Sequence, residues 1–297
     1  MPHVDLPDGA KLAFDIFGAA HLGRNVPIVL VGGVSSLRGD WGRLSNTLAG
    51  VRPGMGDSKL ATKDEHHTIE LLARDLLFLL TQLQWKELAI CGFSMGGVIT
   101  QQLLFLPHHP DRPTPLPFRV THILLTGTLC TQLLDPRYGI PIPPRSDHPL
   151  SHQDKLNFAR ASLERTLDPA WVADPRNASR LDHLLRGAIS GRPSKVIIKQ
   201  IRAMRQFDFT GLHAKLPRNV PFLIIHGDLD RVVPPYCSQE ILRRIPWAKP
   251  LEVGSQSGMV PHLDVGHQWF EYFDAQVWHD VVEGFLTATP NTPLARL

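Results

Sequence analysis

The sequence has few of the features that direct a chain to a membrane or to an oxidising compartment. It holds three cysteines, Cys91, Cys130 and Cys237, an odd and widely spaced set that gives no disulfide framework. No basic segment followed by an apolar one opens the sequence. Every apolar run is well short of the roughly 20 residues that a membrane-spanning helix needs. We therefore expect a reduced, soluble, cytoplasmic protein without stable membrane insertion.

Clusters of basic residues are lacking as well. The formal net charge is only +3, and lysine and arginine are scattered along the chain, so no nucleic-acid surface is predicted. His108 and His109 are adjacent, but no cysteine or acidic residue stands at ligand spacing from them. The sequence therefore predicts a small-molecule substrate, without a metal and without a cofactor.

Apolar residues occupy 43% of the 297 positions, which is enough for one large core. Continuous apolar runs typical of buried strands occupy residues 27–33, 87–91, 118–127 and 221–230. Stretches with helical spacing occupy residues 41–48, 68–83 and 268–286, and Thr68 can cap the second of them. This alternation predicts an α/β fold with a mostly parallel sheet flanked by helices.

Residues 131–217 interrupt the alternation. Helical patterns at 151–167, 178–189 and 193–207 are joined by proline-rich connections, with no strand among them. We interpret residues 131–217 as an inserted helical lid, and residues 1–130 and 218–297 as the core domain.

A single serine between glycines is the first candidate for chemistry. Gly92-Phe93-Ser94-Met95-Gly96 follows a predicted strand and precedes a predicted helix. This setting favours a nucleophile on a sharp turn, with the helix N-terminus supplying partial positive charge beside it. The alternative is a glycine-rich structural turn that contains a serine by chance.

Three motifs together resemble the α/β-hydrolase family over nearly the whole chain. "GFSMGG" at 92–97 is similar to its nucleophile elbow, "GDLDRVVP" at 227–234 to its acid loop, and "DVGHQW" at 264–269 to its histidine loop. The resemblance implies Ser94 as nucleophile, His267 as general base and Asp230 as the acid that orients it. Asp228 and His262 lie close to these positions and remain alternatives.

The resemblance also implies an oxyanion hole made of two backbone N–H groups. One belongs to Met95, after the serine, and the other to Val34, in the loop after the 27–33 strand. The family usually opens that loop with His-Gly, whereas Gly32 stands at the histidine position here. A backbone donor needs no particular side chain, but we expect the loop to lose one internal tether and to be less rigid.

A larger departure lies at residues 50–58. The end of the family's next loop is present as Gly54–Ser58, but only Gly50-Val51-Arg52-Pro53 stands where a central strand should precede it. About half a dozen residues are missing by comparison with the family, so we expect either a gap in the sheet beside the 27–33 strand or a neighbouring strand that closes up to fill it. An inactive or poorly folded form is the alternative that this departure raises.

The resemblance implies a serine hydrolase that cleaves carboxylic esters through an acyl-serine intermediate. A serine at the turn argues against epoxide hydrolases and haloalkane dehalogenases of the same fold, which use an aspartate there. A predicted lid rich in apolar residues favours apolar acyl or lipid-like esters. An acyltransferase of the same fold and a catalytically impaired protein are the alternatives. The last residues, Ala295-Arg296-Leu297, are similar to a peroxisomal address, so the peroxisome is a second predicted location.

Overall fold

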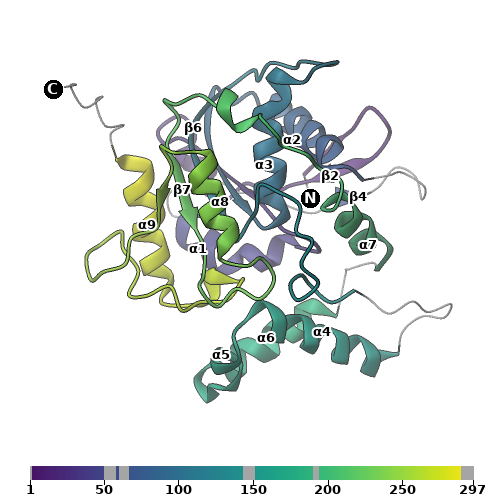
Figure 1. Ribbon diagram of the computed structural model, residues 1–297, viewed down its shortest axis with the longest axis vertical. Helices are drawn as coiled ribbons and strands as arrows, with labels where there is room; N and C mark the ends of the chain where they lie inside the picture. The colour runs from purple at the N-terminus through teal and green to yellow at the C-terminus, as the bar shows by residue number, and fades with distance from the viewer. Residues whose placement is uncertain (1, 50–57, 60–66, 143–150, 190–193, 289–297) are drawn as a thin grey trace.

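The computed structural model describes residues 2–49, 58–59, 67–142, 151–189 and 194–288 (Figure 1). Two features singled out in the sequence lie outside these ranges: the shortened segment at 50–53 and the C-terminal Ala295-Arg296-Leu297. In the described part of the chain, no helix is long and apolar enough to cross a membrane.

A five-stranded parallel sheet forms the centre of the molecule. Its order is β3 (Ile28–Val31), β5 (Glu87–Phe93), β6 (Arg119–Thr126), β7 (Phe222–Ile225) and β8 (Lys249–Pro250). Val31 lies beside Gly92, and Thr126 lies between Phe93 and Ile225, so the strands end along a common edge. The predicted mostly parallel sheet is confirmed, and this edge is where a parallel sheet carries its site.

Helices cover both faces of the sheet because every central strand is apolar on both sides. α2 (Ile69–Leu83), α3 (Met95–Phe105) and α8 (Tyr236–Arg244) pack on one face, and α1 (Gly42–Ala49) and α9 (Ala275–Thr287) pack on the other (Figure 1). Alternate strand residues divide accordingly: Val29 and Ile90 face the first set, and Ile28 and Cys91 face the second. The core therefore has two halves separated by the sheet.

Local sequence signals explain where two of the helices begin. Thr68 Oγ1 accepts a hydrogen bond from Leu71 N–H at 3.0 Å, which confirms the predicted cap of α2. The predicted helix over 268–286 is wrong in its first part, because α9 begins only at Ala275. Phe273 has a φ of 60°, which no right-handed helix accepts, and Asp274 caps α9 from outside. Short 3-10 turns complete the chain at η1 (Ala19–His21), η2 (Arg38–Trp41), η3 (Leu106–His108), η4 (Pro175–Asn177), η5 (His213–Lys215) and η6 (Trp269–Glu271).

The N-terminal strands are not part of the central sheet. β1 (His3–Asp5), β2 (Lys11–Ala13) and β4 (Ser58–Lys59) form a separate antiparallel sheet. Within the described ranges, β3 pairs with β5 and with no other strand. The strand that should lie beyond β3 falls in the segment outside these ranges, so its loss stays a prediction. β3 is in any case the last described strand on its side of the sheet.

Between β6 and β7 the chain forms helices, as predicted for residues 131–217. They are α4 (His152–Thr166), α5 (Pro169–Ala173), α6 (Ala178–Ala188) and α7 (Ser194–Ala203). α4, α5 and α6 lie together at one end of the molecule, whereas α7 stands apart from them (Figure 1). The described residues of 131–217 contain no strand. The domain boundaries and the role of this helical segment as a lid stay predictions.

Candidate active site

Ser94 lies at the sharp turn between β5 and α3. Its backbone angles are φ 55° and ψ −123°, a conformation that costs free energy for a residue with a Cβ atom. Two neighbours hold it there: Ser94 N–H donates to Thr126 O at 2.9 Å, and Thr128 Oγ1 donates to Ser94 O at 2.6 Å. The turn projects the Ser94 side chain from the C-terminal edge of the sheet, with the N-terminus of α3 directly behind it.

Two glycines allow other backbone to approach this turn. A Cβ atom at Gly96 would lie 2.0 Å from Val31 O, so the first turn of α3 packs directly on the end of β3. A Cβ atom at Gly33 would lie 2.8 Å from Ser94 Cβ and 3.2 Å from Ser94 Oγ. Gly33 therefore brings the loop after β3 against the serine side chain.

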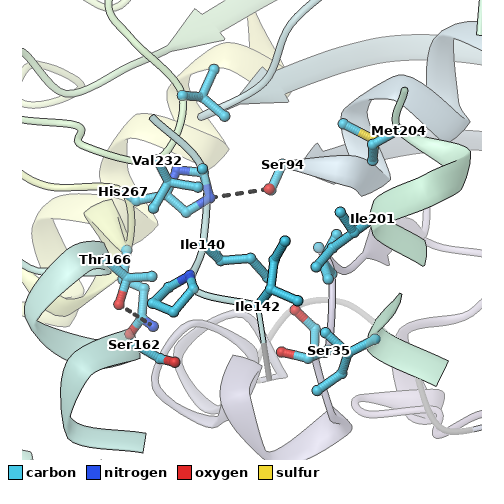
Figure 2. Close-up of a pocket in the computed structure, with 18 of the residues that line it drawn as sticks. Ser35, Ser94, Ile140, Ile142, Ser162, Thr166, Ile201, Met204, Val232 and His267 are labelled. Carbon is cyan, nitrogen blue, oxygen red and sulfur yellow. Dashed lines mark hydrogen bonds between the residues drawn. The ribbon is translucent and has the colours of Figure 1, made fainter. Parts of the chain in front are cut away.

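Ser94, His267 and Asp230, the three residues singled out in the sequence, form a row of hydrogen bonds. His267 Nε2 lies 3.0 Å from Ser94 Oγ (Figure 2). His267 Nδ1 lies 2.7 Å from Asp230 Oδ2. An ionised carboxylate can only accept, so the proton of a neutral His267 belongs on Nδ1 and Nε2 is left to accept from the serine hydroxyl. All three residues are at most 8% exposed. This arrangement can remove a proton from Ser94.

The carboxylate of Asp230 is oriented from both sides. Oδ1 accepts hydrogen bonds from the N–H groups of Val232 and Val233, each at 2.8 Å, which leaves Oδ2 for His267. The buried His226 ring donates from Nε2 to Val233 O at 2.9 Å and lies 3.4 Å from Asp230 Oδ2. Burial lowers the pKa of His226, so the ring beside Asp230 is neutral. Sequence reasoning gave His226 no part in the site, because a histidine at the end of a strand carries no specific signal.

The structure separates the alternatives that the sequence left open. Asp228 is exposed, and its N–H donates to Leu263 O at 2.8 Å in the backbone pairing that turns its side chain outward. His262 is half exposed and lies 3.7 Å from Asp264. Only the pair Asp230 and His267 is brought to Ser94.

Aromatic rings hold the imidazole in place on its other face. The ring centroids of Phe93 and His267 are 4.8 Å apart, and Phe270 meets Phe93 edge to face at 5.4 Å. The residue before the serine and a residue soon after the histidine therefore pack together. This packing restricts the rotation of His267 around the line from Ser94 to Asp230.

The predicted oxyanion donors, Val34 and Met95, lie on the two segments that flank Ser94. Neither N–H group donates a hydrogen bond to the described residues. The loop after β3 (residues 32–37, called the β3 loop below) turns at Ser35, which has a φ of 60°. Ser35 N–H donates to Gln200 Oε1 of α7 at 2.9 Å. Convergence of the Val34 and Met95 N–H groups on one oxygen stays a prediction.

A cavity of about 1070 Å³ opens above Ser94 and His267. Its walls come from the β3 loop, from the segment after β6, and from α4, α6 and α7; Figure 2 shows Ile140, Ile142, Ile201, Met204 and Val232 around the serine and the histidine. The walls are largely aliphatic, and the volume is at the upper end of ordinary ligand sites. No group of three or more potential metal ligands occurs in the described ranges of the chain.

Helices α4, α5 and α6 are fixed to the segment that follows His267. Tyr272 Oη donates to Asp168 Oδ2 at 2.6 Å, and burial raises the pKa of this hydroxyl. Arg180 of α6 donates two hydrogen bonds to the fully buried Glu271 carboxylate, at 2.6 and 2.8 Å. These contacts join one side of the cavity to the histidine loop, and they join residues about one hundred positions apart, so no local pattern could predict them.

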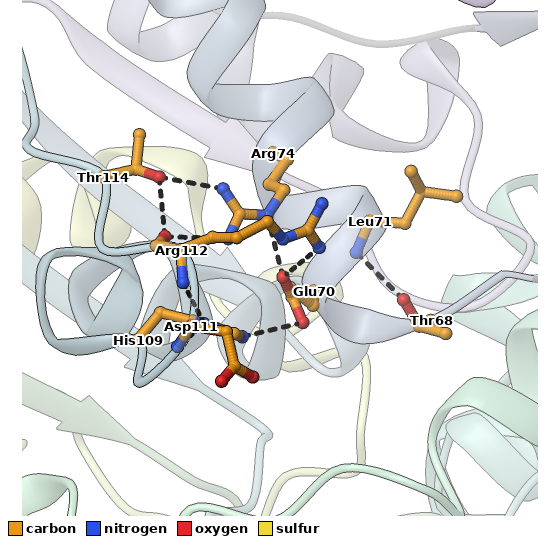
Figure 3. Close-up of polar contacts among 8 residues, drawn as sticks. All are labelled: Thr68, Glu70, Leu71, Arg74, His109, Asp111, Arg112 and Thr114. Carbon is orange, nitrogen blue, oxygen red and sulfur yellow. Dashed lines mark hydrogen bonds and ion pairs between the residues drawn. The ribbon is translucent and has the colours of Figure 1, made fainter.

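Other histidines lie away from this site. His66 is outside the described residues, and His67 is buried, with no hydrogen-bond partner for either ring nitrogen among the described residues. His109 donates from Nε2 to Glu70 at 3.2 Å, because its Nδ1 accepts two backbone N–H groups (Figure 3). Arg74 and Arg112 pair with the same Glu70 carboxylate. This network ties the loop before β6 to α2.

Residues 28–281 match the alpha/beta hydrolase family, and the chain belongs to that family. The resemblance found in its motifs is thereby confirmed.

Solved structures of similar fold cover nearly the whole chain. An enol-lactonase from Burkholderia xenovorans LB400 has a TM-score of 0.71 at 21% identity, over 97% of this chain and 100% of its own. A hydrolase from Pseudomonas aeruginosa PA01 has a TM-score of 0.70 at 19% identity, over 97% and 98%. A thermophilic esterase from Thermogutta terrifontis has a TM-score of 0.67 at 18% identity, over 97% and 100%. At these identities the likeness establishes the fold.

Proposed function

We propose that the protein is a serine hydrolase that cleaves carboxylic esters through an acyl-serine intermediate. The observation that carries the proposal is the hydrogen-bonded row of Ser94, His267 and Asp230 at the floor of a largely aliphatic cavity. Membership of the alpha/beta hydrolase family supports it, as do the esterases and the enol-lactonase among the similar structures.

The first half of the reaction acylates the serine. Ser94 Oγ attacks the ester carbonyl while its proton passes to His267 Nε2, and the carboxylate of Asp230 stabilises the imidazolium that forms. The negative charge that develops on the carbonyl oxygen is placed against the N–H groups of Met95 and Val34. His267 then donates the proton to the leaving alcohol.

The second half of the reaction releases the acid. A water molecule enters in place of the alcohol, His267 accepts a proton from it, and the resulting hydroxide attacks the acyl-serine carbonyl. Collapse of this second tetrahedral intermediate returns the proton to Ser94 Oγ. The protein's groups complete the cycle without a metal or a cofactor.

The walls of the cavity favour an apolar acyl group. A substrate whose carbonyl carbon lies at Ser94 would have hydrocarbon surface on several sides, from Ile140, Ile201, Met204 and Val232. We propose that the helical segment 131–217 acts as a lid over the core of residues 1–130 and 218–297, and that lipid-like esters are the substrate class. Each methylene of chain that enters the cavity contributes about 0.8 kcal/mol.

A chain-length series tests the proposal. p-Nitrophenyl esters from acetate to dodecanoate are supplied to the wild type and to Ser94→Ala, and kcat/KM is measured for each. We expect kcat/KM to rise about fourfold per methylene until the cavity is full, and no turnover by Ser94→Ala. Adding alcohols or thiols to the assay identifies an acyltransferase, which would release p-nitrophenol only when an acceptor is present. Equal turnover by the two proteins would overturn the proposal.

A further inference from the structure

The β3 loop carries Val34, but the position that usually tethers such a loop is blocked here. Gly32 occupies the place where the family resemblance implies a histidine. A Cβ atom at Gly32 would lie 2.8 Å from Ser36 Cβ, 3.3 Å from Ser36 Oγ and 3.4 Å from Trp41 Nε1. Ser36 therefore fills the space that a side chain at residue 32 would need. The loop cannot be anchored from within at that position.

Ser36 N–H donates to Gly33 O at 3.3 Å within the loop, and a second contact, from outside it, adds to this turn. Ser35 has a φ of 60°, a left-handed conformation that costs free energy for any residue other than glycine. Such a conformation persists where its surroundings enforce it. Ser35 N–H donates to Gln200 Oε1 at 2.9 Å, although the two residues are 165 positions apart. Gln200 thus supplies an acceptor to the strained residue of the loop.

Val34 lies between two fixed neighbours as a result. On its N-terminal side, Gly33 packs so closely on Ser94 that there is no room for a Cβ atom. On its C-terminal side, the N–H of Ser35 is bound by Gln200. With the residues before and after it held, Val34 has little freedom to rotate its own N–H group. That N–H has no acceptor among the described residues.

The helix that carries Gln200 also forms a wall of the cavity. Ile197 and Ile201 lie on one side of α7 and line the cavity, as does Met204 just after the helix. Figure 2 shows Ile201 and Met204 beside the cavity. Gln200 lies within the same turns and reaches the β3 loop. One short helix therefore contacts both the space for the acyl group and the loop that carries an oxyanion donor.

We propose that Gln200 is a positioning residue, which fixes the Val34 N–H of the oxyanion hole from the helical segment through Ser35. The inference rests on the proposed function. Gln200 touches neither the substrate carbonyl nor Ser94 in this role. Its amide oxygen takes the place of the internal tether that Gly32 lacks, and it makes the oxyanion hole depend on the position of α7.

Two substitutions separate the acceptor of Gln200 from its bulk. Gln200→Met keeps length and helix propensity but removes the acceptor, whereas Gln200→Glu keeps an acceptor oxygen. Lys195→Ala, an exposed position on the same helix, is the matched control. For each protein, kcat and KM for a short p-nitrophenyl ester are measured, together with the Ki of an alkyl trifluoromethyl ketone. This ketone forms a tetrahedral adduct whose oxyanion uses the same donors.

We expect Gln200→Met to lower kcat about tenfold with KM nearly unchanged, which is less than the roughly hundredfold loss typical of deleting an oxyanion donor. The Ki of the ketone should rise by the same factor as kcat falls. Gln200→Glu and Lys195→Ala should stay close to the wild type in both measurements. Parallel losses in kcat and in ketone affinity identify a defect in binding the oxyanion, which a general loss of stability does not produce.

Three results would overturn the inference while leaving the proposed function intact: wild-type kcat in Gln200→Met, a change confined to KM, or an equal loss in Gln200→Glu. Ser94→Ala, measured beside them, must remove turnover in each case. A wild type that neither hydrolyses the ester nor binds the ketone overturns the proposed function, and the inference with it. The two failures are therefore distinguishable.

Discussion

Replacing Asp230 by asparagine should disable the site without disturbing its shape. The two oxygens of Asp230 have different partners: Oδ1 accepts two backbone N–H groups, from Val232 and Val233, and Oδ2 accepts from His267. An asparagine must place its NH2 group at one of these positions. At the Oδ1 position it would face two buried donors, each of which costs about 1–3 kcal/mol when left unsatisfied. The NH2 group therefore turns toward His267.

The consequence of Asp230→Asn is a wrong tautomer of the imidazole. An NH2 donor facing Nδ1 forces the proton onto Nε2, which can then no longer accept from Ser94. We expect kcat for a p-nitrophenyl ester at neutral pH to fall about 10⁴-fold, or roughly 5 kcal/mol in activation free energy, with the melting temperature little changed. Asp228→Asn, at the exposed carboxylate two residues earlier, should keep wild-type kcat. A loss of less than about tenfold in Asp230→Asn, or an equal loss in Asp228→Asn, would refute this reasoning.

Three further predictions concern the packing around the site and in the core. Gly33→Ala should lower kcat/KM at least about a hundredfold, because the new Cβ would lie 2.8 Å from Ser94 Cβ; Gly39→Ala, on an open part of the chain, is the control. Burial lowers the pKa of His213 to about 4 from its ordinary 6.5, so the unfolded chain binds a proton first as the pH falls. The urea concentration at the midpoint of unfolding should therefore decrease as the pH is lowered from 6.5 to 4. His213→Gln should make this decrease smaller, whereas the control His262→Gln should leave it unchanged. Burial raises the pKa of all three thiols to about 12, so an aromatic disulfide reagent should label none of them at pH 8 in the native protein and all three in urea.

The turn at Ser94 could be predicted from the sequence because its determinants are local. A strand of small and aliphatic residues, glycines on both sides and a helix-forming run afterwards are all within the stretch 87–105. The hydrogen bonds that hold the turn come from Thr126 and Thr128, at the end of the neighbouring strand, and no pattern in the sequence pointed to them.

The choice of Asp230 over Asp228 needed tertiary structure. A Cβ atom at Gly227 would lie 2.0 Å from Val265 O, so the acid loop and the histidine loop run in direct contact. In that contact, Asp228 N–H pairs with Leu263 O, which turns the Asp228 carboxylate to solvent and carries Asp230 toward His267. Two carboxylates two positions apart are equivalent to a sequence motif, and only the pairing of the two loops distinguishes them.

The contacts of the helical segment lay beyond sequence reasoning for a related reason. Arg180 and Glu271 are 91 positions apart, and Ser35 and Gln200 are 165 apart. The amphipathic spacing of α6 and α7 predicts helices but not which core loop each one meets. The closing helix was placed seven residues too early because its apolar spacing continues across Phe273, where the backbone turns left-handed.

Labelling with a fluorophosphonate, followed by intact mass and peptide mapping, tests the central claim most directly. Such a probe reacts with a serine only where a base activates it and an oxyanion hole receives the phosphoryl oxygen. The folded wild type should gain the mass of one adduct, located on Ser94. Ser94→Ala should gain none, and His267→Ala should react far more slowly. A folded wild type that takes no label, or takes it at another residue, would contradict the assignment of Ser94 as the nucleophile.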